Sequence, residues 1–242
     1  LDRFDPESFL ITEENVKERK LRCRLIGKEN MDRLLADGAY IIDELDGTSS
    51  RAVGHYEWSV SVGYVSRLEH LAGAVFAPEV NGGTLFYASR GKGNFIKDGD
   101  GERQTELPNR DLKNAYVIFG VDCFLTKYPV HNRLVTQLGD RVRTSNSNGS
   151  CALPLGLVAC GKADALVQPL QSPWDWAAGK VFIEEAGGKM IFYEMDERGG
   201  IRPVDRLEPR HYNPEERTVG FVAASERNAY DILDMLLVTG SD

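Results

Sequence analysis

The chain has 242 residues, 42% of them hydrophobic and 27% charged, which is enough for one large domain or two modest ones that need no metal or disulfide staple to fold. The net charge is −8, and no cluster of Lys and Arg is interleaved with aromatic residues, which excludes long nucleic acid as a partner. No apolar run approaches the roughly 20 residues of a membrane span. Four cysteines lack the spacing of a zinc site and the density of a disulfide scaffold, so we expect reduced thiols, a cytoplasmic protein and no membrane partner.

The first part of the chain is β-rich. A strand is predicted at 39–43, and further alternating or β-rich runs follow at 57–65, 71–78, 84–89 and 93–99, separated by short polar turns. They predict a meander of antiparallel strands. A turn-rich stretch at 97–111 is expected to be an exposed connection between two halves of the chain. We therefore predict an N-terminal antiparallel-sheet half, residues 1–110, that carries a metal and phosphate site.

The second part alternates strands with helices. Strand-like runs at 115–120, 142–145, 163–168, 187–193 and 218–225 are interleaved with helical patterns near 128–138, 149–161, 174–187 and 226–238, and another exposed connection is expected at 197–217. This order predicts a mixed α/β half, residues 111–242, that contributes Asp175 and the substrate loops. The fold class predicted for the whole chain is α/β, an α+β layered sandwich with alternating helix and sheet layers.

Two carboxylates follow the strand predicted at 39–43. Asp43 falls at its carboxyl end, where open α/β sheets place their ligands, and Asp46 falls in the turn that follows. Gly47 allows close approach of the backbone to a ligand, and Thr48, Ser49 and Ser50 can cap a following helix whose free N–H groups form an anion site. Carboxylates beside an anion site require a cation between them, and Mg²⁺ suits such oxygen ligands. The alternative, Asp43 in a turn and Asp46 as a helix cap, stays open.

Asp175 and Glu13 are further candidates. Helical spacing puts Asp175 in line with Gly179, Phe182 and Ala186, so its carboxylate is aimed inward. A charge in the first helical turn can equally well meet the helix dipole. Taken alone, the pair formed by Glu13 and its neighbour is more typical of a solvated turn.

Read together, the stretches LITEEN (10–15), IIDELDGTSS (41–50) and WDWAAGKVFIEEAGG (174–188) resemble the inositol monophosphatase-like family, which consists of Mg²⁺-dependent sugar and polyol phosphatases of the fructose-1,6-bisphosphatase/inositol monophosphatase superfamily. The resemblance implies two or three Mg²⁺ ions, with ligands at Glu13, Asp43, Asp46 and Asp175 and at the main-chain carbonyl of Leu45. It implies that Glu13 and Thr48 orient the attacking water, and that the amides of Gly47 and Thr48 hold the phosphate. Family members carry a helix pair before this first motif, so we expect that the printed sequence is either truncated or a shortened form.

The resemblance also predicts a reaction and a substrate class. It implies in-line attack of a metal-activated water on the phosphate monoester of a small sugar or polyol, by a homodimer. Ser150, Cys151 and Gln168 match the positions that contact the alcohol part of the substrate. Inositol-directed members carry Glu where Gln168 stands, which weakens the case for inositol 1-phosphate, since an amide accepts hydrogen bonds less strongly than a carboxylate.

Two alternatives remain at this point. One is a 3′-nucleotidase of the same fold that acts on adenosine 3′,5′-bisphosphate, and the other is a non-catalytic member that binds metal and a phosphorylated ligand. Arg51, Arg143 and Lys162 are candidates for contact with a second phosphate, although such residues are more often surface charges. Asp46→Asn is expected to remove turnover without unfolding the protein.

Overall fold

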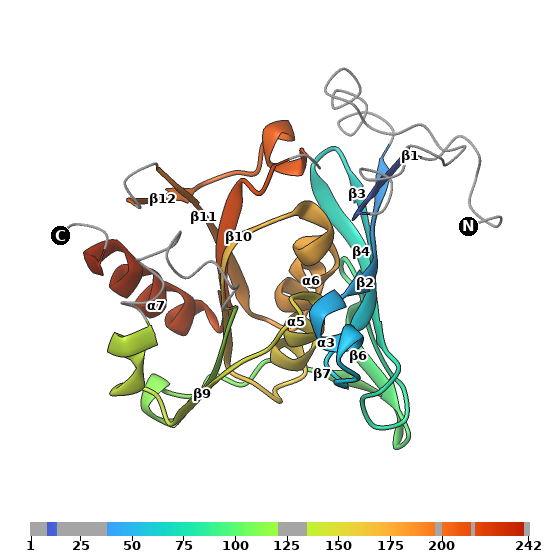
Figure 1. Ribbon diagram of the computed structural model, residues 1–242, viewed down its shortest axis with the longest axis horizontal. Coiled ribbons are helices and arrows are strands. Elements are labelled where there is room, and N and C mark those ends of the chain that lie inside the picture. The colour runs from blue at the N-terminus through green and yellow to red at the C-terminus, as the bar shows by residue number, and fades with distance from the viewer. Residues whose placement is uncertain (1–8, 14–37, 121–134, 197–199, 214–215, 240–242) are drawn as a thin grey trace.

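A computed structural model describes residues 9–13, 38–120, 135–196, 200–213 and 216–239 of the protein (Figure 1). Two β-sheets enclose a pair of helices, and another helix covers the outer face of the second sheet (Figure 1). The larger hydrophobic cluster fills the space between the sheets, and a smaller one lies between the second sheet and the outer helix. The protein is therefore a layered α/β sandwich, as the sequence predicted.

The first sheet has seven strands in sequence order, β1 to β7. The first two strands pair parallel, and every later pair is antiparallel. The strands are β1 (Phe9–Thr12), β2 (Ala39–Asp46), β3 (Ser59–Ser66), β4 (Glu69–Ala77), β5 (Thr84–Ser89), β6 (Gly93–Asp98) and β7 (Gly101–Thr105). The predicted meander is confirmed.

Strand β7 corrects the connection expected at 97–111. Its sequence, GERQT, has no apolar alternation, because the strand lies at the sheet edge with its first four side chains exposed. Pairing of Asp98 with Gly101 closes a tight turn from β6, and Gly101 has a positive φ of 102°. Backbone pairing across this turn forms the strand, so the hydrophobic pattern did not indicate it.

The second sheet is mixed and has the order β12-β11-β13-β10-β8-β9. Strands β8, β9 and β10 pair parallel, and the remaining pairs are antiparallel. The strands are β8 (Tyr116–Phe119), β9 (Thr144–Ser147), β10 (Ala165–Gln171), β11 (Lys189–Met195), β12 (Ile201–Val204) and β13 (Val219–Ala224). Of the connection expected at 197–217, the described residues 200–213 contain β12 and the short 3₁₀ helix η3 (Pro209–Tyr212), which corrects that expectation.

Helices α5 (Ala152–Ala159) and α6 (Pro173–Glu185) lie between the sheets, and α7 (Glu226–Thr239) packs on β11 and β13 from outside (Figure 1). Helix α5 is apolar all round, as a helix buried on every side must be. Helix α6 packs closely on the first sheet, where a Cβ on Gly63 would lie 2.9 Å from the backbone nitrogen of Ala178. Two further short helices are α3 (Thr48–Ala52) and η2 (Leu112–Asn114).

Three of the four predicted helices are thus confirmed. Of the helix predicted near 128–138, residues 135–139 are helical and 121–134 lie outside the described residues. The division into halves at residue 110 stays a prediction, although the two sheets occupy residues 9–105 and 116–224. In the described part of the chain, no helix has the length and apolarity that crossing a membrane needs.

Candidate active site

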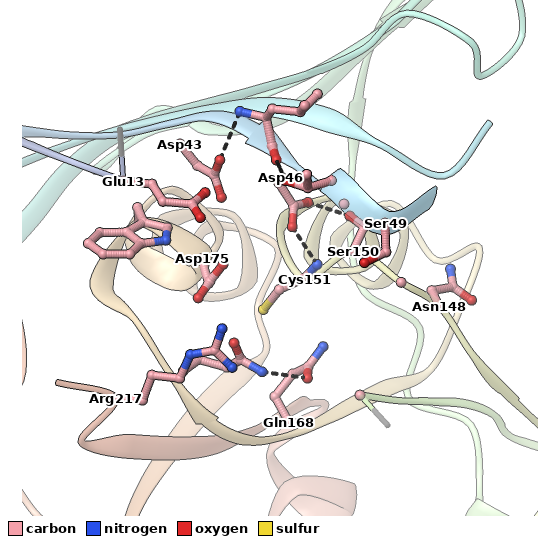
Figure 2. A pocket seen from close by; sticks show the side chains of 17 residues that line it. Glu13, Asp43, Asp46, Ser49, Asn148, Ser150, Cys151, Gln168, Asp175 and Arg217 are labelled. Atoms are coloured by element: carbon pink, nitrogen blue, oxygen red, sulfur yellow. Dashed lines mark hydrogen bonds between the residues drawn. The ribbon is translucent and has the colours of Figure 1, made fainter. Parts of the chain in front are cut away.

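A pocket of about 200 Å³ opens between the sheets where β2 ends (Figure 2). It is bounded by the ends of β1 and β2, by α3, by the starts of α5 and α6, and by β10. Every site residue predicted from the sequence lines it: Glu13, Asp43, Leu45, Asp46, Gly47, Thr48, Ser150, Cys151, Gln168 and Asp175. Residues far apart in the chain therefore meet in one place.

A β-bulge turns Asp43 and Asp46 toward the same side of β2. Residues three apart on a regular strand point to opposite faces. Here Asp43 pairs with Ser61 and Asp46 with Ser59, so three steps along β2 match two steps along β3. The extra residue reverses the alternation and brings both carboxylates into the pocket.

Glu13 reaches the same edge through the parallel pairing of β1 with β2. Thr12 pairs with Ile42, so Glu13 and Asp43 are the next residues along both strands. Parallel strands end on the same side of a sheet, which places the Glu13 carboxylate beside that of Asp43 (Figure 2). This adjacency explains how an acidic residue that reads locally as part of a solvated turn becomes a pocket residue.

Gly47 makes the turn that follows the bulge. It is left-handed, with φ 86° and ψ 38°, and a Cβ at this position would lie 2.7 Å from the carbonyl oxygen of Glu57. Thr48 then begins α3 and donates its hydroxyl hydrogen to the Leu45 carbonyl at 3.0 Å. Because that hydrogen is used, the Thr48 oxygen can act toward a ligand or a water only as an acceptor.

Asp46 is buried and caps α5. Its carboxylate accepts hydrogen bonds from the backbone N–H groups of Cys151 (2.8 Å) and Ala152 (3.0 Å), the first residues of that helix. The hydroxyl of Ser59 donates to it at 2.9 Å, and that of Ser150 donates to it as well. The helix-cap alternative therefore describes a real contact, but the helix is α5 and not the one that follows Asp46 in sequence.

Asp175 combines a structural contact with a place in the pocket. It is the third residue of α6 and accepts the backbone N–H of Ser172 at 2.9 Å, within a capping box. Gly179 and Phe182, in line with it along the helix, are buried, as the predicted inward face requires. The capping and ligand readings of this residue are thus compatible.

The carboxylates of Asp43, Asp46 and Asp175 offer oxygen atoms that all lie within 4.8 Å of one another. Burial, followed by the charges of Asp46 and Asp175, raises the pKa of Asp43 to about 9. Burial, followed by the charge of Asp46, raises the pKa of Asp175 to about 8, and burial also raises the pKa of Asp46. The cluster therefore favours binding of positive charge, either as protons or as a divalent cation with oxygen ligands.

The opposite side of the pocket carries hydrogen-bond donors. Gln168 is buried, and its Oε1 accepts the side-chain N–H of Gln171 at 3.2 Å. A Cβ on Gly120 would overlap this oxygen, so glycine is required beside the Gln168 amide. Arg217 lies on the same side, near Gln168 (Figure 2). Cys151 is buried, and burial raises the pKa of its thiol well above the ordinary value, so the thiol is neutral and no nucleophile.

Seven pocket residues were not among the predicted site residues: Ser49, Gly120, Asn148, Gly149, Gln171, Trp174 and Arg217. Most are close in sequence to predicted positions, and widening each motif by a few residues would have found them. Arg217 has no such signal, because it lies in a segment read as an exposed connection.

The three cations considered for a second phosphate do not line this pocket. Arg51, Arg143 and Lys162 are all exposed, and Arg51 lies over the ring of Trp58, 5.2 Å from its centroid. Because they are exposed and lie outside the pocket lining, the structure favours their interpretation as surface charges.

The fold and the pocket define a layered α/β protein with a buried carboxylate cluster at the end of its first sheet. The chain belongs to the inositol monophosphatase family, since the family model of that description matches residues 2–228. A Neisseria meningitidis protein named putative Nus factor SuhB is 30% identical over 191 residues, which cover 76% of this chain and 70% of the relative. A Thermotoga maritima protein named fructose-1,6-bisphosphatase/inositol-1-monophosphatase is 30% identical over 195 residues, 81% of this chain and 66% of the relative.

Solved structures support the fold. The Thermotoga maritima IMPase matches with a TM-score of 0.72 and 24% identity, covering 98% of this chain and 77% of the other. The extragenic suppressor protein suhB of Bartonella henselae matches with a TM-score of 0.71 and 23% identity, covering 96% and 76%. The family thus includes proteins named as phosphatases and proteins named as Nus factors.

Proposed function

We propose that the protein is a Mg²⁺-dependent phosphatase that hydrolyses the phosphate monoester of a small sugar or polyol. The observation that carries this proposal is the cluster of Asp43, Asp46 and Asp175, with oxygen atoms within 4.8 Å of one another, in a pocket that Glu13 also lines. The name of the Thermotoga maritima relative, and that of a Bacillus subtilis inositol-1-monophosphatase 27% identical over 187 residues, support the same reaction.

The side chains fit Mg²⁺. Carboxylate and carbonyl oxygens are the ligands this ion prefers. Burial, followed by the neighbouring carboxylate charges, raises the pKa values of Asp43 and Asp175, and a divalent cation would compensate the negative charge that gathers here. We propose that Glu13, Asp43, Asp46, Asp175 and the Leu45 carbonyl hold two or three ions. When bound, Mg²⁺ lowers the pKa of an attacking water and stabilises negative charge on the leaving oxygen.

Glu13 and Thr48 would position the water. A carboxylate accepts hydrogen bonds, and the Thr48 hydroxyl, having given its hydrogen to Leu45, is restricted to accepting as well. Two acceptors fix both hydrogens of one water and leave an oxygen lone pair aimed at phosphorus. Such positioning, rather than covalent chemistry, supplies much of the rate enhancement of phosphoryl transfer.

The phosphate would lie against the turn at Gly47 and Thr48. Both residues line the pocket, and the missing Cβ of Gly47 permits the left-handed turn that starts α3. The alcohol part of the ester would then face Ser150, Cys151 and Gln168. The Ser150 hydroxyl donates its hydrogen to Asp46, so toward the substrate its oxygen can only accept a hydrogen bond. Gln168, in contrast, can donate through its amide N–H groups.

The experiment that tests this function is phosphate release by the purified protein, with and without Mg²⁺. The substrates are inositol 1-phosphate, fructose 1,6-bisphosphate, histidinol phosphate and adenosine 3′,5′-bisphosphate, with Asp43→Asn as the control variant. Mg²⁺-dependent release that the variant loses would support the proposal and identify the substrate branch. Mg²⁺ binding without release from any substrate would favour the non-catalytic alternative instead.

A further inference from the structure

The pocket has two walls of opposite chemistry. One wall holds the carboxylates of Glu13, Asp43 and Asp46, and the other presents Gln168 and Arg217 (Figure 2). On the proposed function, the phosphate to be cleaved belongs to the carboxylate wall, where cations would meet it. The second wall is therefore left to the alcohol part of the substrate.

We propose that Arg217 recognises a second negatively charged group on the alcohol part, so that the substrate is a phosphate ester that carries another anion, either a carboxylate or a phosphate. This inference rests on the proposed phosphatase function and deepens it. It makes Arg217 a residue that determines specificity, with no role in the attack on phosphorus.

Arg217 brings positive charge to the pocket. Among the described residues that line the pocket, Arg217 is the sole Lys or Arg. Arg217 lies two residues before β13 (Val219–Ala224), on the side of the pocket formed by the second sheet. Its positive charge partly offsets the rise in the pKa of Asp175 that burial and Asp46 cause. A guanidinium presents five N–H donors in a planar fork that matches two oxygens of a carboxylate or phosphate.

The groups beside Arg217 in the pocket also favour a ligand that accepts hydrogen bonds. The side-chain oxygen of Gln168 accepts a hydrogen bond from Gln171, and its amide N–H groups can donate to a ligand. The main-chain carbonyl of Gln168 accepts a hydrogen bond from the Tyr193 hydroxyl at 2.6 Å, which holds this part of the backbone in place. No carboxylate interrupts this wall among the described pocket residues other than Asp175 at its border. The donors on this side, the Gln168 amide and the Arg217 guanidinium, bind acceptors, and the charged guanidinium binds a charged acceptor most strongly.

A competing role for Arg217 is to balance the charge of Asp175. Divalent cations at the carboxylate cluster would take over that balance and would repel a guanidinium from Asp175. In the metal-loaded enzyme the charge of Arg217 would no longer be needed to balance Asp175. The two roles differ in a measurable way, because balancing Asp175 affects Mg²⁺ binding and all substrates alike.

The test uses pairs of esters that differ by one anionic group. Glycerol 1-phosphate and 3-phosphoglycerate differ by a carboxylate, and fructose 1-phosphate and fructose 1,6-bisphosphate differ by a phosphate. Values of kcat and KM are measured for the wild type, Arg217→Met, Arg217→Lys and the matched control Arg143→Met, which removes an exposed arginine outside the pocket.

We expect the wild type to prefer the more anionic member of one pair, and that pair identifies the second anion. Arg217→Met should lower the ratio of kcat/KM for the anionic to the neutral member about ten- to a hundredfold, mainly through KM. Arg217→Lys should recover part of the ratio, and Arg143→Met should leave it at the wild-type value. Equal losses for both members of each pair, accompanied by a weaker Mg²⁺ dependence, would overturn the inference and assign Arg217 to Asp175.

Failure of the proposed function is distinguishable from failure of this inference. If the wild type releases phosphate from none of the four esters, calorimetric binding of the same esters in the presence of Ca²⁺ takes the place of turnover. A preference for the anionic member that disappears in Arg217→Met supports the role of Arg217 in a binding protein. Equal affinity of the wild type for both members overturns it.

Discussion

The carboxylate of Asp46, at the end of a strand in the first sheet, accepts the backbone N–H of Cys151, the residue that begins helix α5, at 2.8 Å. The same carboxylate accepts four more hydrogen bonds, from Ser59, Ser150, Ala152 and Leu153. A candidate metal ligand is therefore also the group that anchors a buried helix to the first sheet. The two other aspartates of the cluster do not carry so many protein donors.

Asp46→Asn is accordingly expected to damage stability as well as activity, contrary to the expectation drawn from sequence. An amide has one acceptor oxygen, and its NH₂ group would face donors that lie within hydrogen-bond distance of the carboxylate. We expect a loss of about 2–4 kcal/mol in the free energy of unfolding, measured by urea denaturation in EDTA. A variant as stable as the wild type would show that the α5 cap contributes little.

Asp43→Asn isolates the metal site. The amide oxygen can keep the hydrogen bond from the backbone N–H of Leu45, 2.9 Å from the carboxylate in the wild type, while one charge leaves the cluster. In EDTA near pH 8 we expect the melting temperature to rise by about 2–4 °C, as roughly 1 kcal/mol of stabilisation would give. Turnover with Mg²⁺ should fall at least about a hundredfold, since a ligand charge is gone. An active variant would argue against Asp43 as a metal ligand.

Stability without metal should fall as pH rises from about 7 to 9. Asp43 and Asp175 have folded-state pKa values of about 9 and 8, against 3.8 ordinarily. In this window the folded state binds more protons than the unfolded state, so the free energy of unfolding decreases with pH, and the contribution is lost as pH passes the folded-state values. The buried His70, with its pKa lowered to about 3 by burial, does not interfere, because its contribution is complete above its ordinary value of 6.5.

The measurement is urea unfolding in EDTA at several pH values, repeated with Mg²⁺. We expect Mg²⁺ to stabilise the protein more at the alkaline end, because protons no longer compete for the carboxylates. Asp43→Asn should flatten the slope in EDTA. A wild-type slope equal to that of the variant would show that Asp43 is ionised at neutral pH without a metal.

Gly47→Ala should impair both folding and turnover. The left-handed conformation and the 2.7 Å approach of a Cβ to the Glu57 carbonyl oxygen strain any residue with a side chain here. We expect a loss of about 1–3 kcal/mol in the free energy of unfolding and a rise in KM for the phosphate ester. Gly54→Ala, at a glycine that also has a positive φ but open space around its Cβ position, is the control for backbone strain alone.

Sequence by itself determined the elements whose signal is local and the motifs that identify the family. Alternating runs predicted strands β3 to β6, and helical spacing predicted the inward face of Asp175. The three motifs brought together seven predicted site residues that line one pocket, and the wider resemblance added Ser150, Cys151 and Gln168, which line it too. These features depend on periodicity and residue type, which the chain shows directly.

Tertiary structure alone decided how the site is assembled. The bulge that turns Asp43 and Asp46 to one side appears only in the pairing of β2 with β3, and the contact between Asp46 and α5 joins residues 105 positions apart. Arg217 enters the pocket from a segment without any recognisable pattern. Strand register, long-range capping and the second wall of a pocket depend on partners distant in sequence, and local periodicity does not encode which distant segments will meet.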